Sequence, residues 1–447
     1  MATLPDSQRL ARTRMLLDDL ISHVENERNK RHLAVSGSTK ALGVFKAPAT
    51  VFPVLPLEIL DYICQQLTFS DLTIVVQANS TLNLVGTRRL YHSIGADMDS
   101  TRMLQCMISL DRNPELPLLV KSFEVNLIKE FLTKSFYSLL ERTLRKMVNL
   151  TALVIELPKR HSPTWILPIT ASSSSTPSPA RIFKLRSLTT SMHCKPPLAR
   201  FLDSQPEITE LTLRGINSDA SNPLFPFMTT LFHPNGIIPP DSPFAMSSNL
   251  TQAPSQFTLH PTSLPKLSHF NAIHAGPAVI RDIIKSRPVT HMSIPLFAPH
   301  TMETLSALSS ASKPLARLSV MSFDPLAPSF LIEELATRFP DLEALHIVVL
   351  MAEVTAGMLL DWGKFLVGFK KLKYITFMAA LGNDNDTHGD ESREEINEKK
   401  IAKVWHASCS TLKTIILPQG KVWFEGTRED ETVNEEGNWR CLSSDGE

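Results

Sequence analysis

The sequence lacks the short motifs on which many catalytic and cofactor sites are built. It contains no Gly-x-x-x-x-Gly-Lys-Ser/Thr loop, no Gly-x-Gly-x-x-Gly turn, no Gly-x-Ser-x-Gly elbow and no His-Glu-x-x-His pair. Only 16 of 447 residues are glycine, which is few for a chain that binds phosphates through backbone amides. The 14 histidines are scattered, and pairs such as His161 and His193, or His269 and His274, have no partner at metal-ligand spacing. We therefore expect no enzymatic activity, no cofactor and no metal.

An excess of charge of either sign is also missing, because 45 basic residues balance 45 acidic ones. The chain as a whole has no strong field to hold nucleic acid or an anionic membrane. Two basic clusters have no interleaved aromatic residues, so solvated surface is the favoured interpretation. These clusters are Arg142, Arg145 and Lys146, and Lys159 and Arg160.

Cysteines and long apolar runs are scarce as well. The five cysteines are odd in number, lie far apart and form no Cys-x-x-Cys, which favours a reducing compartment over a disulfide framework or zinc site. Residues Met1–Leu20 have no uninterrupted apolar core, and no run of about 18 apolar residues occurs. We expect a soluble protein of the cytoplasm or nucleus, with no membrane or nucleic-acid partner.

One stretch, Leu55–Leu72, has the pattern of two short helices joined by a turn. Pro56 lies where a first-turn proline is tolerated, because its missing N–H has no helical acceptor there. Ser70 followed by Asp71 predicts the start of the second helix. Apolar residues at helical spacing form one face of the first helix: Ile59, Leu60, Ile63 and Leu67.

This stretch resembles an F-box, a compact helical module that opens with Leu-Pro, continues with Glu and paired aliphatics, and later carries Asp-Leu. The resemblance covers about residues 52–95. The matching positions are Leu55, Pro56, Glu58, Ile59, Leu60, Ile63, Leu67, Asp71 and Leu72.

The resemblance implies a substrate-recruiting subunit of a Skp–cullin–F-box ubiquitin ligase. In that family the F-box docks on the Skp adaptor and the repeat domain holds the protein to be ubiquitinated. The implied adaptor-binding residues are Leu55, Pro56, Leu57, Ile59, Leu60, Ile63, Leu67 and Leu72. They offer more apolar surface than so small a module can bury alone, as expected for helices held in a partner's groove.

Two other functions stay open. The module could cap the repeats, burying Ile59, Ile63 and Leu67 against residues 96–130 in an interaction scaffold outside any ligase. A divergent hydrolase would need a nucleophile beside a base, and the sequence offers no such arrangement to name.

A second pattern recurs after the helical module. Each instance, or phrase, begins with an aliphatic residue and has further apolar residues three and usually five positions later, as in Val120, Phe123 and Val125. The alternation at the end of each phrase predicts a short strand. Residues 330–339 form the clearest intervening helix, and Pro340 ends it. The phrases begin at Val120, Leu150, Leu185, Ile208, Leu267, Val289, Leu315, Leu342, Leu372 and Leu412.

Most steps between phrases fall near the leucine-rich-repeat period of about 20–29 residues. The chain resembles an irregular leucine-rich repeat, although the asparagine or cysteine of the consensus is missing from most units. The expected fold class is α/β, with a short helical F-box-like module followed by a solenoid of parallel strands and outer helices over residues 96–425.

The remaining segments are expected to be peripheral. Within residues 1–50, the apolar pattern predicts an N-terminal helix over 5–30, which docks on the protein or pairs with another helix. The rest of this segment is expected to be a linker. The solenoid carries inserts at 158–180, expected to be a disordered loop, and at 217–263, expected to be a long loop or one degenerate repeat. The acidic tail over 426–447 is expected to fray.

Residues 384–395 place Asp, Asp, Gly and Glu at positions 1, 3, 6 and 12 of a calcium loop. The preceding segment predicts a strand instead of a helix, and Glu391 occupies a normally aliphatic position. A solvated acidic loop is therefore the expectation.

Overall fold

The structure, a computed structural model, describes two compact units divided between Ile94 and Gly95. The described residues are 55–95, 98–128, 132–158, 164–168, 183–214, 257–273, 275–298, 300–381, 397–425 and 439–442. The predicted N-terminal helix and the candidate calcium loop lie outside them, as does most of both predicted inserts.

The described part of the first unit, residues 55–94, is a module of three helices followed by the short strand β1 (Ser93–Ile94). Two of the helices begin at polar caps, since the Thr68 side chain accepts from the Asp71 N–H and the Asn79 side chain accepts from the Leu82 N–H at 2.8 Å. The predicted cap at Ser70 is wrong, because the hydroxyl of Thr68 takes that role and the second helix starts two residues earlier, at Phe69. The helices are α2 (Leu57–Gln66), α3 (Phe69–Val75) and α4 (Ser80–Leu90).

The module has a small apolar core of its own. Helix α4 packs against both α2 and α3. Gly86 permits this packing, because a Cβ built there would lie 2.6 Å from Cγ1 of Val76. The buried core residues are Cys64, Leu72, Val75, Leu82 and Val85.

The second unit is built on a single sheet in which sequential strands are spatial neighbours. Strands β2 to β11 pair in parallel, and β12 and β13 extend the sheet antiparallel. The strands are β2 (Ser122–Asn126), β3 (Ala152–Glu156), β4 (Ser187–Thr190), β5 (Glu210–Leu213), β6 (His269–Ala272), β7 (His291–Leu296), β8 (Arg317–Ser322), β9 (Ala344–Val354), β10 (Tyr374–Leu381), β11 (Thr414–Ile416), β12 (Val422–Glu425) and β13 (Trp439–Leu442).

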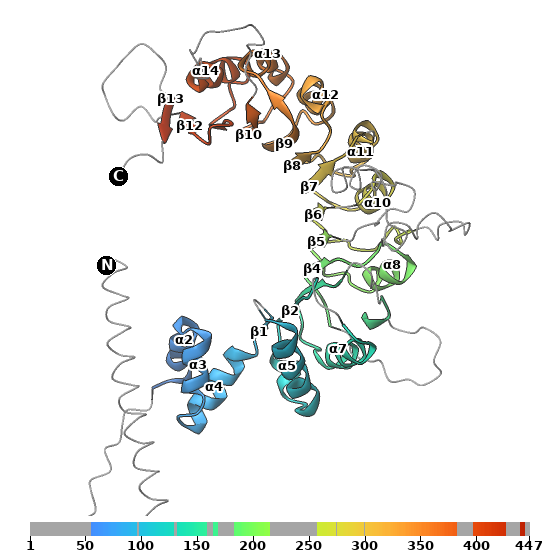
Figure 1. Ribbon diagram of the computed structural model, residues 1–447, viewed down its shortest axis with the longest axis vertical. Helices are drawn as coiled ribbons and strands as arrows, with labels where there is room; N and C mark the ends of the chain where they lie inside the picture. The colour runs from blue at the N-terminus through green and yellow to red at the C-terminus, as the bar shows by residue number, and fades with distance from the viewer. Residues whose placement is uncertain are drawn as a thin grey trace, which may run out of the picture. The chain divides into compact units, whose positions relative to one another are not determined.

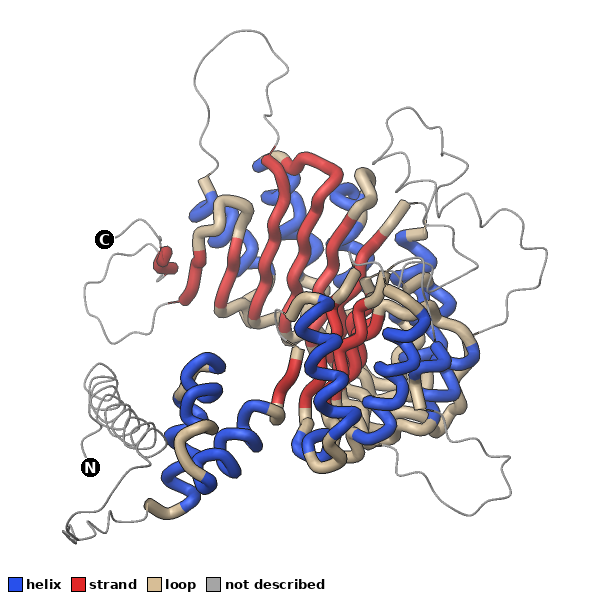
Figure 2. The backbone as a smooth tube through the Cα atoms, turned by 60° about the horizontal axis from the view of Figure 1, so that its bottom comes forward, coloured by secondary structure: helices blue, strands red, loops and turns tan. Residues whose placement is uncertain are grey.

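Helices of this unit lie along the outer side of the arc that its strands form (Figure 1), and they cover one face of the sheet (Figure 2). The predicted helix over 330–339 is confirmed as α12, which ends just before Pro340. The helices are α5 (Ser100–Arg112), α6 (Leu116–Leu119), α7 (Lys134–Lys146), α8 (Pro196–Asp203), α10 (Pro277–Ile284), α11 (Thr301–Leu308), α12 (Leu331–Arg338), α13 (Ala356–Leu366) and α14 (Glu398–Ser408), with 3-10 turns η1 (Thr164–Ile166) and η3 (Ala327–Ser329).

Every one of the ten repeated phrases contributes a strand, and the central apolar residues of the phrases align in one register across the sheet. The α/β solenoid-like architecture is thereby confirmed. None of these residues is more than 3% exposed. They are Phe123, Leu153, Leu188, Leu211, Phe270, Met292, Leu318, Leu345, Ile375 and Ile415.

Strands β5 and β6 flank the long insert in the sequence and pair directly in the sheet, with Leu211 opposite Phe270. Among the described residues, no strand lies between them. The chain returns along the helical side of the unit, where Phe257 and Leu259 are buried.

Arg287 anchors this returning segment. Its side chain is 1% exposed and donates to four main-chain carbonyls. Nε donates to Ser263 at 2.9 Å and Nη2 to His260 at 3.0 Å, while Nη1 donates to Asp282 at 2.6 Å and Ile283 at 2.9 Å. One guanidinium thus ties the end of the insert to the C-terminal end of α10, where a cation also meets the negative end of the helix dipole.

The prediction of a frayed tail over 426–447 is wrong for residues 439–442. These residues form β13, which pairs antiparallel with β12 in the register Val422 to Leu442. Trp439, Cys441 and Leu442 give this short stretch strand character within an otherwise acidic segment.

Met292→Ala tests the aligned apolar row. We expect it to lower the free energy of unfolding by about 2–5 kcal/mol, because Met292 is buried on both sides by its strand neighbours. The matched control Ser293→Ala, on the opposite face of the same strand, should change it by no more than about 0.5 kcal/mol. Urea unfolding followed by circular dichroism measures both, and equal effects would contradict the register.

Arg287→Met tests the anchor of the insert. We expect a loss of about 2–4 kcal/mol, because four buried carbonyls lose a charged donor. Limited proteolysis should show faster cleavage within 257–264 in the variant. Unchanged cleavage and stability would show that the segment is held by its apolar residues alone.

Candidate protein-interaction site

The predicted adaptor-binding residues divide into three groups by exposure. Leu55, Leu57 and Ile59 are 45%, 51% and 46% exposed, and Pro56 beside them is also exposed. Half-buried positions are Leu60, Ile63 and Leu67. Leu72 is buried.

Helical geometry explains this division. Leu60, Cys64 and Leu67 follow each other at spacings of four and three, which places them on the side of α2 that packs in the module. Pro56 caps α2, and its carbonyl accepts from the N–H groups of Ile59 and Leu60. The start of α2 therefore presents a run of aliphatic side chains that the module itself leaves uncovered.

Leu72 has a different role from the one predicted. Its side chain is 5% exposed and lies in the core cluster with Cys64 and Val75. It holds α3 in the module, so it supports the exposed surface and is not available to a partner.

Four further exposed apolar residues of the module were not among the predicted site residues. Tyr62 lies three residues after Ile59, so the two are neighbours on the surface of α2. Ile74 on α3 is 57% exposed. Helical projection of 57–66 indicates Tyr62, and projection of 69–75 places Ile74 on the side of α3 opposite the buried Leu72. The four are Tyr62, Phe69, Ile74 and Leu84.

The polar groups around this surface favour binding over catalysis. Gln65 donates to the carboxylate of Asp61 at 2.8 Å. Burial, and then the charge of Asp61, raise the pKa of the Cys64 thiol, so it stays protonated and unreactive at neutral pH. The surface therefore offers a partner apolar area, worth about 1.5–3 kcal/mol for each large side chain fully buried.

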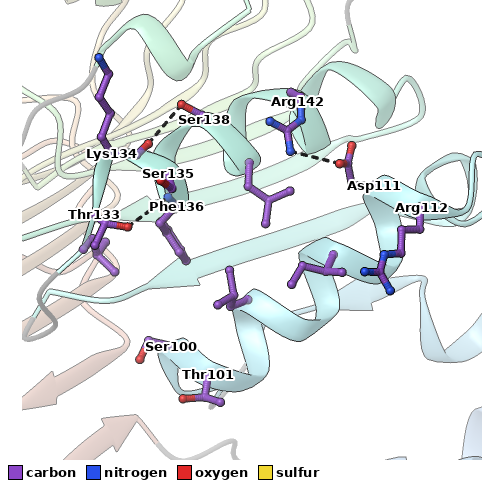
Figure 3. A pocket seen from close by; sticks show the side chains of 14 residues that line it. Ser100, Thr101, Asp111, Arg112, Thr133, Lys134, Ser135, Phe136, Ser138 and Arg142 are labelled. Atoms are coloured by element: carbon purple, nitrogen blue, oxygen red, sulfur yellow. Dashed lines mark hydrogen bonds and ion pairs between the residues drawn. The ribbon is translucent and has the colours of Figure 1, made fainter.

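A groove of about 850 Å³ lies between α5 and α7 of the second unit (Figure 3). Apolar side chains such as Leu104, Ile108 and Leu139 line it, with hydroxyl and charged groups around them. Asp111 accepts from Lys146 at 2.6 Å and from Arg142 at 3.2 Å, and these hydrogen bonds, that of Lys146 first, lower its pKa. The carboxylate is thus held ionised, and no histidine or cysteine lines the groove to act as a base or nucleophile.

Within the described ranges, no group of three or more His, Cys, Asp or Glu side chains is placed to hold a metal ion. No helix in the same ranges has both the length and the apolar character needed to cross a membrane.

A scan against protein-family models and a search of curated proteins found no match to this chain.

Leu72→Ala and Ile74→Ala separate core from surface on the same helix. We expect Leu72→Ala to cost about 2–5 kcal/mol, which is comparable to the whole stability of a domain this small. Ile74→Ala should cost no more than about 0.5 kcal/mol. Amide hydrogen exchange over residues 57–90 of the full chain reports both, and loss of protection in the Ile74 variant alone would contradict the packing.

Proposed function

We propose that this chain is a substrate-recruiting adaptor of a Skp–cullin–F-box ubiquitin ligase. The helical module binds a Skp-type adaptor, and the leucine-rich-repeat-like unit binds the protein to be ubiquitinated. The observation that carries the proposal is the exposed aliphatic run of Leu55, Leu57 and Ile59 at the start of α2, next to a separate core.

Small size supports a role in association for this module. Domains of about 40 residues usually need disulfides, a metal or a partner for full stability. The module buries five residues in its cluster while Tyr62, Phe69 and the α2 run stay exposed. Covering these side chains with a partner's groove would remove apolar surface from water on both sides.

The second unit supports a role in holding another protein. Its strands expose alternate residues on the face opposite the helices, and consecutive repeats extend that face without a break from β2 to β11. A long, rigid sheet face presents many side chains in fixed register. On this proposal the chain binds the target protein, and the other ligase subunits carry out ubiquitin transfer.

The proposal is tested by pull-down of a purified Skp-type adaptor on the full chain. We expect Leu55→Ala/Pro56→Ala to weaken binding by about ten- to hundredfold, because lost apolar contact of about 1.4–2.8 kcal/mol has that effect on affinity. Leu57→Ala/Ile59→Ala should weaken it to a similar extent.

Leu326→Ala is the matched control, since it removes a leucine that is 70% exposed in the second unit. Hydrogen exchange over 57–90 confirms that each variant keeps the module folded. Recovery of the adaptor by the double variants at the wild-type level would reject the ligase assignment and favour the alternative, a leucine-rich-repeat interaction scaffold not attached to a ligase.

A further inference from the structure

The open face of strands β6 to β10 carries an ordered set of side chains between the buried apolar rows. One row, at the start of the strands, is in register across the sheet: His269, His291, Arg317, Ala344 and Tyr374. Arg317 and Tyr374 are exposed, and both histidines are half-buried. This combination of imidazole, guanidinium and phenol on neighbouring strands is absent from the parallel positions on β2 and β3, which are Ser122 and Ala152.

The two histidines are stacked and share one hydrogen-bonding arrangement. Their ring centroids lie 4.2 Å apart with an interplanar angle of 23°. Nδ1 of His269 lies 2.9 Å from the Ser268 hydroxyl, and Nδ1 of His291 lies 2.9 Å from the Thr290 hydroxyl. Because each Nδ1 is engaged, the Nε2 atoms are the groups left to interact with a molecule on this face.

Negative charge is scarce around this row. Arg317 makes no ion pair with any residue that the structure describes. Glu343 is paired with Lys373 at 2.9 Å, and its pKa is lowered first by that hydrogen bond and then by nearby charges that include Arg317. The one carboxylate in register with the histidines is Glu210, at the β5 end. The row therefore offers donors and positive charge without a bound carboxylate at its centre.

A second row, four residues further along the same strands, is apolar. Its members are in register across the sheet: Pro295, Met321, Val348 and Met378. Met321 is 45% exposed, and Ile273 at the end of β6 is 40% exposed. Four residues of strand separate the two rows by about 13 Å.

A polar row lies between them, formed by Ser293, Ser319, His346 and Thr376. The Nδ1 of His346 also has a hydroxyl partner, here across the strands, 3.1 Å away on Ser319 of β8. Small hydroxyl side chains leave room for a main chain to lie over them and can donate to its carbonyls.

These features exclude two other ligands for the face. Stacked imidazoles do not converge on a point, so they do not form a metal site. One arginine beside two half-buried histidines is too little positive charge to follow a nucleic-acid backbone.

We propose that this face binds an extended segment of a partner protein whose residues alternate between acidic and apolar, lying across strands β6 to β10. Its carboxylate or phosphate groups lie against His269, His291 and Arg317, and its apolar side chains lie against Met321 and Val348. Side chains on opposite edges of an extended chain can span the two rows. The claim that this segment belongs to a ubiquitination target rests on the proposed function; its binding to the face does not.

The proposal has a pH signature. Burial, followed by the proximity of His269 and Arg317, lowers the pKa of His291, so His291 is largely neutral at pH 7 in the free protein. A bound anion favours the imidazolium and raises that pKa, so the complex takes up a proton. Affinity therefore increases as pH falls from 7.5 to 6.0, and levels off below the pKa of the free protein.

The test is selection of a random twelve-residue peptide library, displayed on phage, against the full chain at pH 6.5. We expect the enriched peptides to alternate acidic and apolar residues. A labelled synthetic peptide of the enriched sequence should bind at least about threefold more tightly at pH 6.0 than at pH 7.5. Arg317→Glu should weaken it at least about tenfold, and His269→Gln/His291→Gln should remove the pH dependence.

Arg112→Glu, a charge reversal at an exposed position on α5, is the matched control and should leave the affinity unchanged. Replacing the acidic residues of the peptide with phosphoserine, and competing with inorganic phosphate, distinguishes carboxylate from phosphate recognition. Failure to enrich any peptide, enrichment of basic peptides, or equal binding by Arg317→Glu would each overturn the proposal. Adaptor binding in the pull-down would stand in all three cases, so failure here is separable from failure of the proposed function.

Discussion

The row of apolar side chains that runs through the ten parallel strands is the constraint on which the second unit depends. Phe123 at one end and Ile415 at the other belong to one continuous register. A single repeat cannot bury its apolar face alone, so each strand relies on the two beside it. Because side chains alternate in a strand, fixing this row inside also fixes the intervening residues outside. The side chains on the open face of the sheet are therefore fixed by the same register that fixes the core.

The sequence was informative wherever local spacing alone decides structure. The phrase with apolar residues at alternate positions predicted all ten strands, and Pro340 marked the end of α12. The direct pairing of β5 with β6 could not be predicted, because the length of the segment between their phrases is compatible with a long loop as well as with a further repeat. Strand β13 was missed because four residues in an acidic tail become a strand only when β12 provides an edge.

The helical module shows the same limit at smaller scale. Leu55 and Ile59 were identified by pattern and are exposed, but Leu72 belongs to the same pattern and is buried. Helical periodicity in the sequence identifies an apolar face, but it does not indicate whether another helix of the module packs against that face. Leu72 and Ile74 are two positions apart on α3 and so lie on opposite sides of the helix, with Leu72 in the core cluster and Ile74 exposed. The histidine row was missed because its members are far apart in sequence and meet only through the register of the sheet.

The two units expose surfaces of different chemistry. The module exposes apolar area with little charge, whereas the sheet face combines imidazole, guanidinium and thioether groups. On the functions proposed above, the first surface suits a stable partner and the second selects among partners. Within the described residues, the two sets of side chains belong to different compact units, so each can be altered without changing the other.

Binding of a Skp-type adaptor by the helical module can be measured by hydrogen exchange of the full chain with and without the adaptor. We expect slower exchange over residues 55–75 when the adaptor is added, and unchanged exchange over strands β6 to β10. Unchanged exchange over 55–75 in the presence of saturating adaptor would contradict this binding.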